Sequence, residues 1–424
     1  MADELKTTCC IAGGGPAGLM LGLLLARAGV DTIVLEKHGD FLRDFRGDTI
    51  HPSTLELMHE LGWLEDFLKL PHQKVPRVNA WFGARKIVMA DLRHLPVECG
   101  YIAMMPQWNF LNFLASRAAR YPAFRLMMRA KAKRLVATDG GVSGVDADTE
   151  AGRVRIRADL VVAADGRSST LRANALITAR DLGAPMDVFW FRLPRAASDT
   201  GETAGYFGVG HIFVALNRGD YWQCALVIPK GGADAMRARG LDHLRRTIAG
   251  LAPFPADRAN AIAGWDQVKL LTVTVDRLER WHRPGLLCIG DAAHAMSPVG
   301  GVGVNLAVQD AVAAANELWR PLREGTVTAA NLQRIQERRM FPTRVTQSLQ
   351  LAIQNRVIYR ALQGATQIEP PFLIRLLTSV PLLSRIPARL LGLGVRPEHI
   401  RSPELMPAGR KSKAADLAAP RLVV

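Results

Sequence analysis

Three glycines near the amino terminus have the spacing of a dinucleotide-binding turn. Gly13, Gly15 and Gly18 fit the pattern G-x-G-x-x-G. In such a turn the first glycine allows the tight bend from strand to helix, the second lets the backbone approach a pyrophosphate, and the third lets the helix pack closely on the strand. The free N–H groups at the start of the helix favour the negatively charged phosphates. Residues 13–18 are therefore predicted to hold a dinucleotide.

The residues around this turn supply the context that the motif needs. The apolar run at 7–12 predicts a buried strand, and residues 17–28 predict a helix. A second strand at 31–36 completes a β-α-β unit. Its last residue, Glu36, can accept hydrogen bonds from a ribose diol and disfavours a phosphorylated ribose, so FAD or NAD is expected there rather than NADP. The neighbouring residues expected at the same cofactor are Pro16, Ala17 and Lys37.

Two further motifs follow predicted strands later in the chain. Residues 165–172 read D-G-x-x-S-x-x-R, a spacing that is less generic than a simple turn. Residues 290–294 read G-D-A-A-H, which places Asp291 at the carboxyl end of a strand, where ligands of α/β proteins bind. A glycine-rich loop at 298–305 then opens a helix near Val304. The N-terminus of that helix can face a group that becomes anionic, such as a reduced isoalloxazine ring.

In this order and spacing, the three motifs resemble those of the FAD-dependent aromatic hydroxylases with the p-hydroxybenzoate hydroxylase fold. The resemblance extends over residues 7–350 and includes the segments 45–53 and 105–107. One departure is Val302, which stands where many quinone-pathway relatives carry a glutamine, so no substrate subfamily is assigned. The residues that the resemblance implies at the cofactors are Arg46, Gln107, Asp165, Gly290, Asp291, Pro298, Gly301, Gly303, Val304 and Asn305.

The resemblance also implies an activity. FAD is the expected cofactor, and NAD(P)H is the expected co-substrate. Because the sequence holds no second dinucleotide fingerprint, NAD(P)H is expected to dock transiently. Oxygen would add to the reduced flavin, and the flavin hydroperoxide would hydroxylate a phenolic or polycyclic aromatic small molecule. The alternatives are a reductase or oxidase of the same fold without oxygen transfer, and a non-catalytic flavin-binding protein.

The predicted elements indicate an α/β fold. A Rossmann-like FAD-binding domain is expected beside a middle, mixed or antiparallel β-sheet domain for the substrate, followed by C-terminal helices. Residues 81–91 are predicted as strand, and residues 181–275 as a β-rich region with a hairpin at 217–220. The expected division is 1–72, 97–180 and 269–350 for FAD binding, 73–96 and 181–268 for the substrate sheet, 351–401 for C-terminal helices, and 402–424 for a loose tail.

Aromatic and histidine side chains are the candidates for substrate contact and catalysis. His51 is a candidate base or relay for a phenolic proton, or else a structural residue at a helix start ahead of Pro52. His294 is expected to be structural, and because it has no partner at metal-binding spacing, no metal is expected. The aromatics of the middle sheet would either line a flat apolar pocket or pack as ordinary core. The candidates for substrate contact are Trp190, Tyr206, Phe213 and Trp222.

Composition narrows the partners and the cellular compartment that are expected for this protein. The net charge is +15, but lysine and arginine are scattered and no nucleic-acid-binding motif is present, so no nucleic-acid partner is expected. The five cysteines lack Cys-x-x-Cys spacing and predict buried thiols in a reducing compartment. No signal peptide is visible, and arginines and prolines interrupt the apolar segment at 372–395, so contact with a membrane surface is not favoured. A cytoplasmic monomer or homodimer that acts on an aromatic small molecule and O2 is expected.

Overall fold

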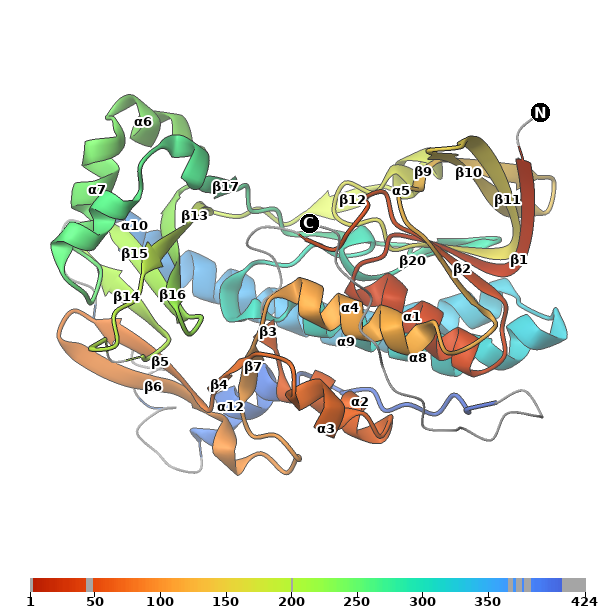
Figure 1. The fold of residues 1–424 in the computed structure, drawn as a ribbon, viewed down its shortest axis with the longest axis horizontal. Helices are drawn as coiled ribbons and strands as arrows, with labels where there is room; N and C mark the ends of the chain where they lie inside the picture. The colour runs from red at the N-terminus through yellow and green to blue at the C-terminus, as the bar shows by residue number, and fades with distance from the viewer. Residues whose placement is uncertain are drawn as a thin grey trace.

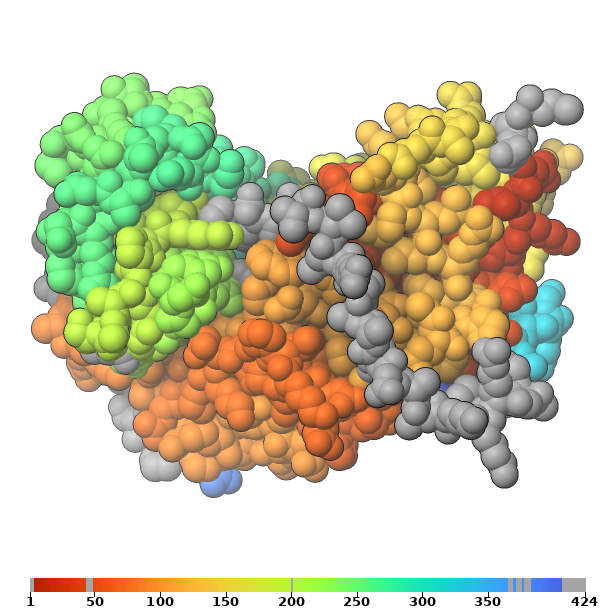
Figure 2. Space-filling view, viewed as in Figure 1, coloured from red at the N-terminus to blue at the C-terminus, as the bar shows by residue number. Residues whose placement is uncertain are grey.

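Most of the chain is described by a computed structural model (Figure 1). Two β-sheets lie at opposite ends of the molecule, and long helices run between them. Figure 2 shows that the surface is hollowed between the two ends. The described residues are 3–42, 49–199, 201–364, 369–370, 376 and 383–405.

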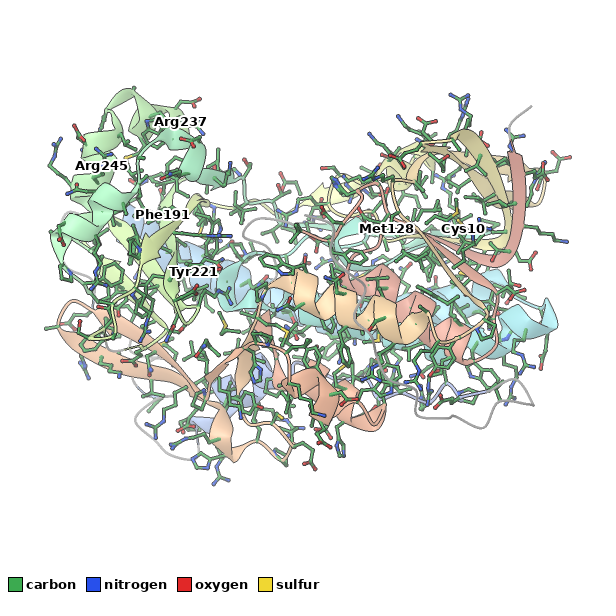
Figure 3. The ribbon with its side chains drawn as sticks, in the orientation of Figure 1. Cys10, Met128, Phe191, Tyr221, Arg237 and Arg245 are labelled. Carbon is green, nitrogen blue, oxygen red and sulfur yellow. The ribbon has the colours of Figure 1, made fainter. Side chains whose placement is uncertain are left out.

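The first sheet contains the glycine-rich turn. Its four central pairings, from β20 to β8, are parallel, and β19 adds an antiparallel edge. Parallel strands are buried on both faces, which explains the continuous apolar run at 9–12 and the complete burial of Cys10 (Figure 3). The strand order is β19 (His282–Arg283), β20 (Leu286–Cys288), β11 (Gly152–Ala163), β1 (Asp3–Ala12), β2 (Thr32–Leu35) and β8 (Phe124–Met127).

Helices cover this sheet, and a hairpin extends it. The Leu- and Ala-rich helix after the glycine turn is buried from residue 17 to residue 26, because it packs against two other helices as well as the sheet. The hairpin is formed by β9 and β10, and β10 pairs with β11. These elements are α1 (Pro16–Arg27), α4 (Gln107–Ala118), α8 (Gly303–Glu324), α9 (Ala329–Ile353), β9 (Lys131–Thr138) and β10 (Gly141–Thr149).

The second sheet is mixed. Its pairings are antiparallel except for the parallel pair β14–β5. Residues 81–91, predicted as strand, belong to the two strands β5 and β6, which pair antiparallel because Gly83 turns the chain with a φ of 57°. The strand order is β17 (Lys269–Leu271), β13 (Met186–Pro194), β16 (Tyr221–Pro229), β15 (His211–Asn217), β14 (Ala204–Gly208), β5 (Arg77–Phe82) and β6 (Arg85–Asp91).

The two faces of the second sheet pack against different partners. One face carries Phe191 and lies under helices that the β-rich prediction for 181–275 missed. The other face packs against the C-terminal end of the long helical run and against Val299. The covering elements are α6 (Ala233–Ala238), α7 (Leu241–Ala249) and η2 (Ala256–Ala261) on the first face, and the π-helical turn η6 (Gln354–Ile358) with α10 (Tyr359–Gln363) on the second.

Short elements complete the fold. None of the helices in the described part of the chain has the length and apolar character of a membrane span. Much of the apolar segment at 372–395 lies outside the described residues. The short strands are β3 (Thr49–Ile50), β7 (Ile102–Met104), β4 (Gln73–Val75), β12 (Ala179–Asp181) and β18 (Asp276–Leu278); the short helices are α2 (Pro52–Glu60), α3 (Leu64–Leu68), α5 (Thr170–Asn174), α12 (Arg385–Gly392), η1 (Leu92–His94), η3 (Trp265–Gln267), η4 (Gly290–Ala292) and η5 (Val299–Gly301).

Candidate FAD site

The glycine-rich turn has the shape of a phosphate cradle. Gly13 has a φ of 110°, and a Cβ atom there would lie 2.3 Å from the Ala164 carbonyl oxygen. A Cβ atom at Gly18 would lie 1.9 Å from the Gly13 oxygen. At Gly15, by contrast, a Cβ atom would meet nothing within 4 Å. The backbone therefore closes tightly behind the turn and leaves open space in front of Gly15.

That open space adjoins the start of α1. No side chain caps this helix end, and Pro16 occupies its first turn. Uncapped N–H groups at a helix start are donors that suit a phosphate. The residues present therefore fit the pyrophosphate of a dinucleotide.

Glu36 lies one residue beyond β2, beside the same turn. Its Oε2 accepts the Gly14 N–H at 3.0 Å, and its Oε1 accepts the His38 N–H at 3.0 Å. The side chain is buried beside the turn and oriented by these bonds, and a carboxylate oxygen can accept more than one hydrogen bond. Lys37 is exposed next to it.

The motif at 165–172 forms a self-contained turn. The Ser169 hydroxyl donates to Asp165 Oδ1 at 2.5 Å, and the Leu171 N–H donates to Oδ2 at 3.3 Å. Ser169 Oγ in turn accepts the Arg172 N–H at 3.0 Å and caps α5. Both oxygens of Asp165 are thus engaged within the turn. The open space beside Gly166 marks where its backbone can approach a ligand.

Arg172 joins this turn to the G-D-A-A-H motif. Its guanidinium donates to the Ala292 carbonyl oxygen at 3.2 Å and to the Arg167 carbonyl oxygen at 2.9 Å. Arg167 in turn lies 3.4 Å from Asp291 Oδ2. The position of Arg172 in the D-G-x-x-S-x-x-R pattern indicated that this arginine has a role. The sequence did not show that it bonds to the Ala292 carbonyl oxygen.

A buried ion cluster holds the Gly290 turn. Asp310 Oδ2 accepts the Gly290 N–H at 3.1 Å and lies 2.5 Å from His294 Nε2. Asp310 Oδ1 accepts Arg339 Nε at 2.8 Å. Burial raises the pKa of Asp310, but His294 and Arg339 outweigh it and hold the pKa below its ordinary value. His294 is therefore structural, as predicted, while the Asp291 side chain remains 34% exposed and accessible to a ligand.

The glycine-rich loop is tied to the segment after residue 48. The Thr49 hydroxyl donates to the Gly301 carbonyl oxygen at 2.7 Å. Asn305 Oδ1 accepts the His51 N–H at 2.9 Å and the Thr54 hydroxyl at 2.7 Å. Asn305 Nδ2 donates to the Thr49 carbonyl oxygen at 3.2 Å. The Asn305 side chain is thus engaged in holding the loop, with Pro298 capping η5, Gly303 opening α8 and Val304 following it.

His51 is fully buried at the N-terminus of α2. Its Nδ1–H donates to the Leu391 carbonyl oxygen at 2.7 Å. Burial lowers the pKa of His51 to about 4, so the ring is neutral near pH 7. These contacts favour the structural interpretation of His51 over a catalytic base.

The structure separates the four candidate substrate aromatics. Phe213 and Trp222 are buried in the cluster under α7, and Tyr206 packs against the same cluster. Trp222 Nε1 also donates to Asp199 at 2.8 Å. Only Trp190 among the four packs on the face that contacts Val299 of the glycine-rich loop. Phe213 and Trp222 are therefore core residues of the second sheet, and Tyr206 is a half-buried residue packed against that core.

Two further residues were predicted to contact the flavin, Gln107 and Arg46. Gln107 begins α4 directly after β7 and is half-buried. Arg46 lies outside the described residues. No group of three or more His, Cys, Asp or Glu side chains within the described ranges is placed to hold a metal ion.

The fold and the cradle define an FAD-dependent oxidoreductase. Residues 6–348 match the family described as FAD binding domain, and the chain belongs to that family. The predicted fold class and the predicted class of enzyme, an FAD-dependent aromatic monooxygenase, are confirmed.

Named relatives show where the chain lies within this class. It is 32% identical over 391 residues to 6-methylpretetramide 4-monooxygenase of Streptomyces rimosus, which covers 91% of each chain. It is 28% identical over 319 residues to rifampicin monooxygenase of Rhodococcus hoagii, which covers 71% of this chain and 61% of the relative. The fold resembles that of OxyS anhydrotetracycline hydroxylase from Streptomyces rimosus, with a TM-score of 0.71, 24% identity, and coverage of 92% of this chain and 77% of the other.

Proposed function

We propose that this monooxygenase uses NAD(P)H and O2 to hydroxylate a phenolic or polycyclic aromatic small molecule. The observation that carries the proposal is the meeting of three separated motifs at one edge of the first sheet, around the open space at Gly15. The name of the 32% identical relative, 6-methylpretetramide 4-monooxygenase, supports an aromatic substrate of this kind. Bound FAD would supply the oxygen-transfer chemistry, and the protein orients and encloses the reactants.

Four parts of the chain would hold FAD. Gly15 and the start of α1 would bind the pyrophosphate, and Glu36 would bind the ribose. Asp291, with its exposed carboxylate, would bind a hydroxyl of the ribityl chain. The glycine-rich loop at 298–305 would lie beside the isoalloxazine ring, with the N-terminus of α8 favouring negative charge there.

We infer that the second sheet covers the substrate with its Trp190 face. That face is lined by apolar side chains and packs against Val299, so it joins the glycine-rich loop directly. Apolar and aromatic walls are typical of sites for flat aromatic ligands. The division into an FAD-binding part and a substrate sheet follows from this arrangement.

His51 is fully buried and bonded to the Leu391 carbonyl oxygen, which does not suit a catalytic base. We therefore assign deprotonation of the phenol to other groups or to solvent. NAD(P)H would dock transiently, because the sequence carries one dinucleotide fingerprint. The five cysteines are free and buried, which supports a reducing, cytoplasmic compartment. The enzyme would act as a monomer or a homodimer.

The test is a coupled assay on the FAD-loaded protein. NADH or NADPH oxidation and O2 consumption are recorded with a panel of phenols and polycyclic aromatics, and products are analysed by mass spectrometry. The proposal expects oxidation to accelerate with an aromatic that is recovered in hydroxylated form. If NAD(P)H is consumed and only hydrogen peroxide forms with every aromatic, a reductase or oxidase replaces the proposal.

A further inference from the structure

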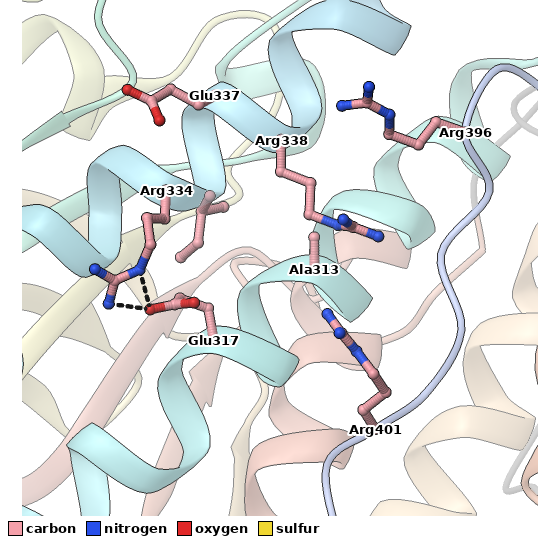
Figure 4. Close-up of a pocket in the computed structure, with 8 residues that line it drawn as sticks. Ala313, Glu317, Arg334, Glu337, Arg338, Arg396 and Arg401 are labelled. Atoms are coloured by element: carbon pink, nitrogen blue, oxygen red, sulfur yellow. Dashed lines mark hydrogen bonds and ion pairs between the residues drawn. The ribbon is translucent and has the colours of Figure 1, made fainter.

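A cavity lies between α8, α9 and the C-terminal segment at 396–401 (Figure 4). Its volume is about 400 Å³, and it shares no lining residue with the FAD cradle. Small-ligand sites commonly have volumes of about 300–1,000 Å³. Its charged lining residues are four arginines and two glutamates: Arg334, Arg338, Arg396, Arg401, Glu317 and Glu337.

Two of the arginines are already paired. Arg334 lies 2.6 Å from Glu317 Oε1, and Figure 4 shows this pair at one side of the cavity. Arg338 Nε lies 2.7 Å from Oε1 of the buried Glu398. Because Arg338 makes this pair through Nε, its two Nη groups remain for a ligand. Glu337 accepts a hydrogen bond from Gln333 at 2.7 Å.

The other two arginines have no carboxylate partner in the described part of the chain. Arg396 lies over the ring of Phe341, 5.2 Å from its centroid, and both Arg396 and Arg401 are exposed. In Figure 4 Arg338 on α9 and Arg401 on the C-terminal segment line the cavity from two different walls. With four arginines against two glutamates, the charged lining of the cavity is net positive, which favours an anion.

The wall that carries Arg401 is held in place. Asn316 Oδ1 accepts the Arg401 N–H at 2.7 Å and the Ser402 N–H at 3.1 Å. Asn316 Nδ2 donates to the His399 carbonyl oxygen at 2.8 Å. The buried Glu398 anchors the same segment to α9. The cavity is therefore formed before any ligand arrives, which lowers the entropic cost of binding.

We propose that this cavity binds a phosphate-bearing anion through Arg338, Arg396 and Arg401. The planar donor fork of a guanidinium matches the oxygens of a phosphate, and three such groups line the same cavity. The site is independent of the FAD cradle and of the hydroxylation reaction. The phosphate belongs either to free orthophosphate or to a nucleotide.

The test measures binding to the FAD-loaded protein by isothermal titration calorimetry. Orthophosphate and ADP are titrated separately at constant ionic strength, set with sodium chloride, because simple screening would otherwise imitate binding. Arg396→Gln and Arg401→Gln each remove one cation from the cavity. Arg85→Gln removes an exposed cation of β6 outside the cavity and is the matched control.

The proposal expects saturable binding of at least one of the two probes, with Kd about tenfold higher in each cavity variant, as for the loss of a charged hydrogen bond. The control variant should bind as the unmodified chain does. A lower Kd for ADP than for orthophosphate would identify the ligand as a nucleotide. Equal Kd values for the two probes would identify it as free phosphate. Absence of saturable binding, or equal Kd values in Arg401→Gln and Arg85→Gln, would overturn the proposal.

Discussion

Arg172 donates a hydrogen bond to the Ala292 carbonyl oxygen at 3.2 Å, across 120 residues of sequence. The same guanidinium lies 3.7 Å from the buried Asp276 carboxylate. One arginine thus fixes the D-G-x-x-S-x-x-R turn against the G-D-A-A-H turn. The relative position of Gly166 and Asp291, which both face the proposed FAD site, depends on it.

Replacing this arginine should therefore weaken both the fold and the cofactor site. Arg172→Met is expected to lower the free energy of unfolding by about 2–3 kcal/mol, because bonds to a charged donor are lost and Asp276 loses its cation. FAD affinity should fall with it. Thermal unfolding and flavin fluorescence titration measure the two effects. Arg93→Met, which breaks an exposed pair with Asp91, is the control and should cost less than about 1 kcal/mol.

The glycine turn allows a sharper separation of fold from cofactor binding. Gly15→Ala should leave the apoprotein's melting temperature unchanged, because a Cβ atom there meets nothing within 4 Å and φ is −78°. It should raise the Kd for FAD about tenfold or more by occupying the pyrophosphate space. Gly18→Ala should instead destabilise the apoprotein, since its Cβ atom would lie 1.9 Å from the Gly13 oxygen. Unchanged FAD affinity in Gly15→Ala would contradict the placement of the pyrophosphate.

The buried Asp310 should make stability depend on acid pH. Its pKa is lowered in the folded protein, so its contribution is present above the ordinary carboxyl pKa and is lost as the pH falls through the folded value. Asp310→Asn should lower stability at pH 7 by about 3–5 kcal/mol, because the buried Arg339 guanidinium loses one of its two carboxylate partners. Urea unfolding across acid pH measures this. The substitution should also flatten the acid part of the profile, and an unchanged profile would contradict the assignment.

His51 should prove structural. In the folded protein the pKa of His51 is about 4, below the ordinary value of a histidine. As the pH falls, the unfolded chain therefore binds a proton at this residue before the folded protein does. His51 thus contributes stability at pH 7 that is lost on acidification. His51→Gln is expected to lower the melting temperature and to leave the pH profile of kcat unchanged. General-base catalysis contributes about a hundredfold or more. A loss of kcat in that range, with the profile altered, would identify His51 as the base.

The two faces of the second sheet should respond differently to substitution. Trp190→Phe is expected to change KM for the aromatic substrate with little effect on the melting temperature, because Trp190 is half-buried on the Val299 face. Phe213→Ala should lower the free energy of unfolding by about 3–5 kcal/mol, because the ring is fully buried under α7. If Trp190→Phe leaves KM unchanged for every accepted aromatic, the substrate does not contact this residue.

Local patterns made the first sheet predictable. The apolar strand at 7–12, the helix after Gly15 and the strand ending before Glu36 follow from hydrophobic runs and turn residues within a short window. The second sheet was predicted less well. Helices α6 and α7 are only six and nine residues long. Helices of that length show too few apolar repeats to be distinguished from the strand patterns on either side of them. Residues 81–91 were predicted as strand, but the turn at Gly83 that divides them between two paired strands was not predicted.

The site was predictable in its backbone and not in its side-chain partners. Glycines and the position of Asp291 follow from strand ends, which sequence patterns can locate. Asn305 and Asp165 were predicted at the cofactor, but their polar atoms hold neighbouring loops. Such partners come from tertiary contacts, as between Asp310 and Arg339, and no local spacing encodes them.

The central claim is that the chain transfers oxygen from O2 to an aromatic ring with FAD bound. It is tested most directly by turnover under isotopically labelled O2 with NAD(P)H and the best aromatic from the panel. The account predicts a hydroxylated product that carries one labelled oxygen atom and that disappears in Gly15→Ala at limiting FAD. A product whose new oxygen comes from water, or NAD(P)H oxidation that yields only labelled hydrogen peroxide with every aromatic, would contradict it.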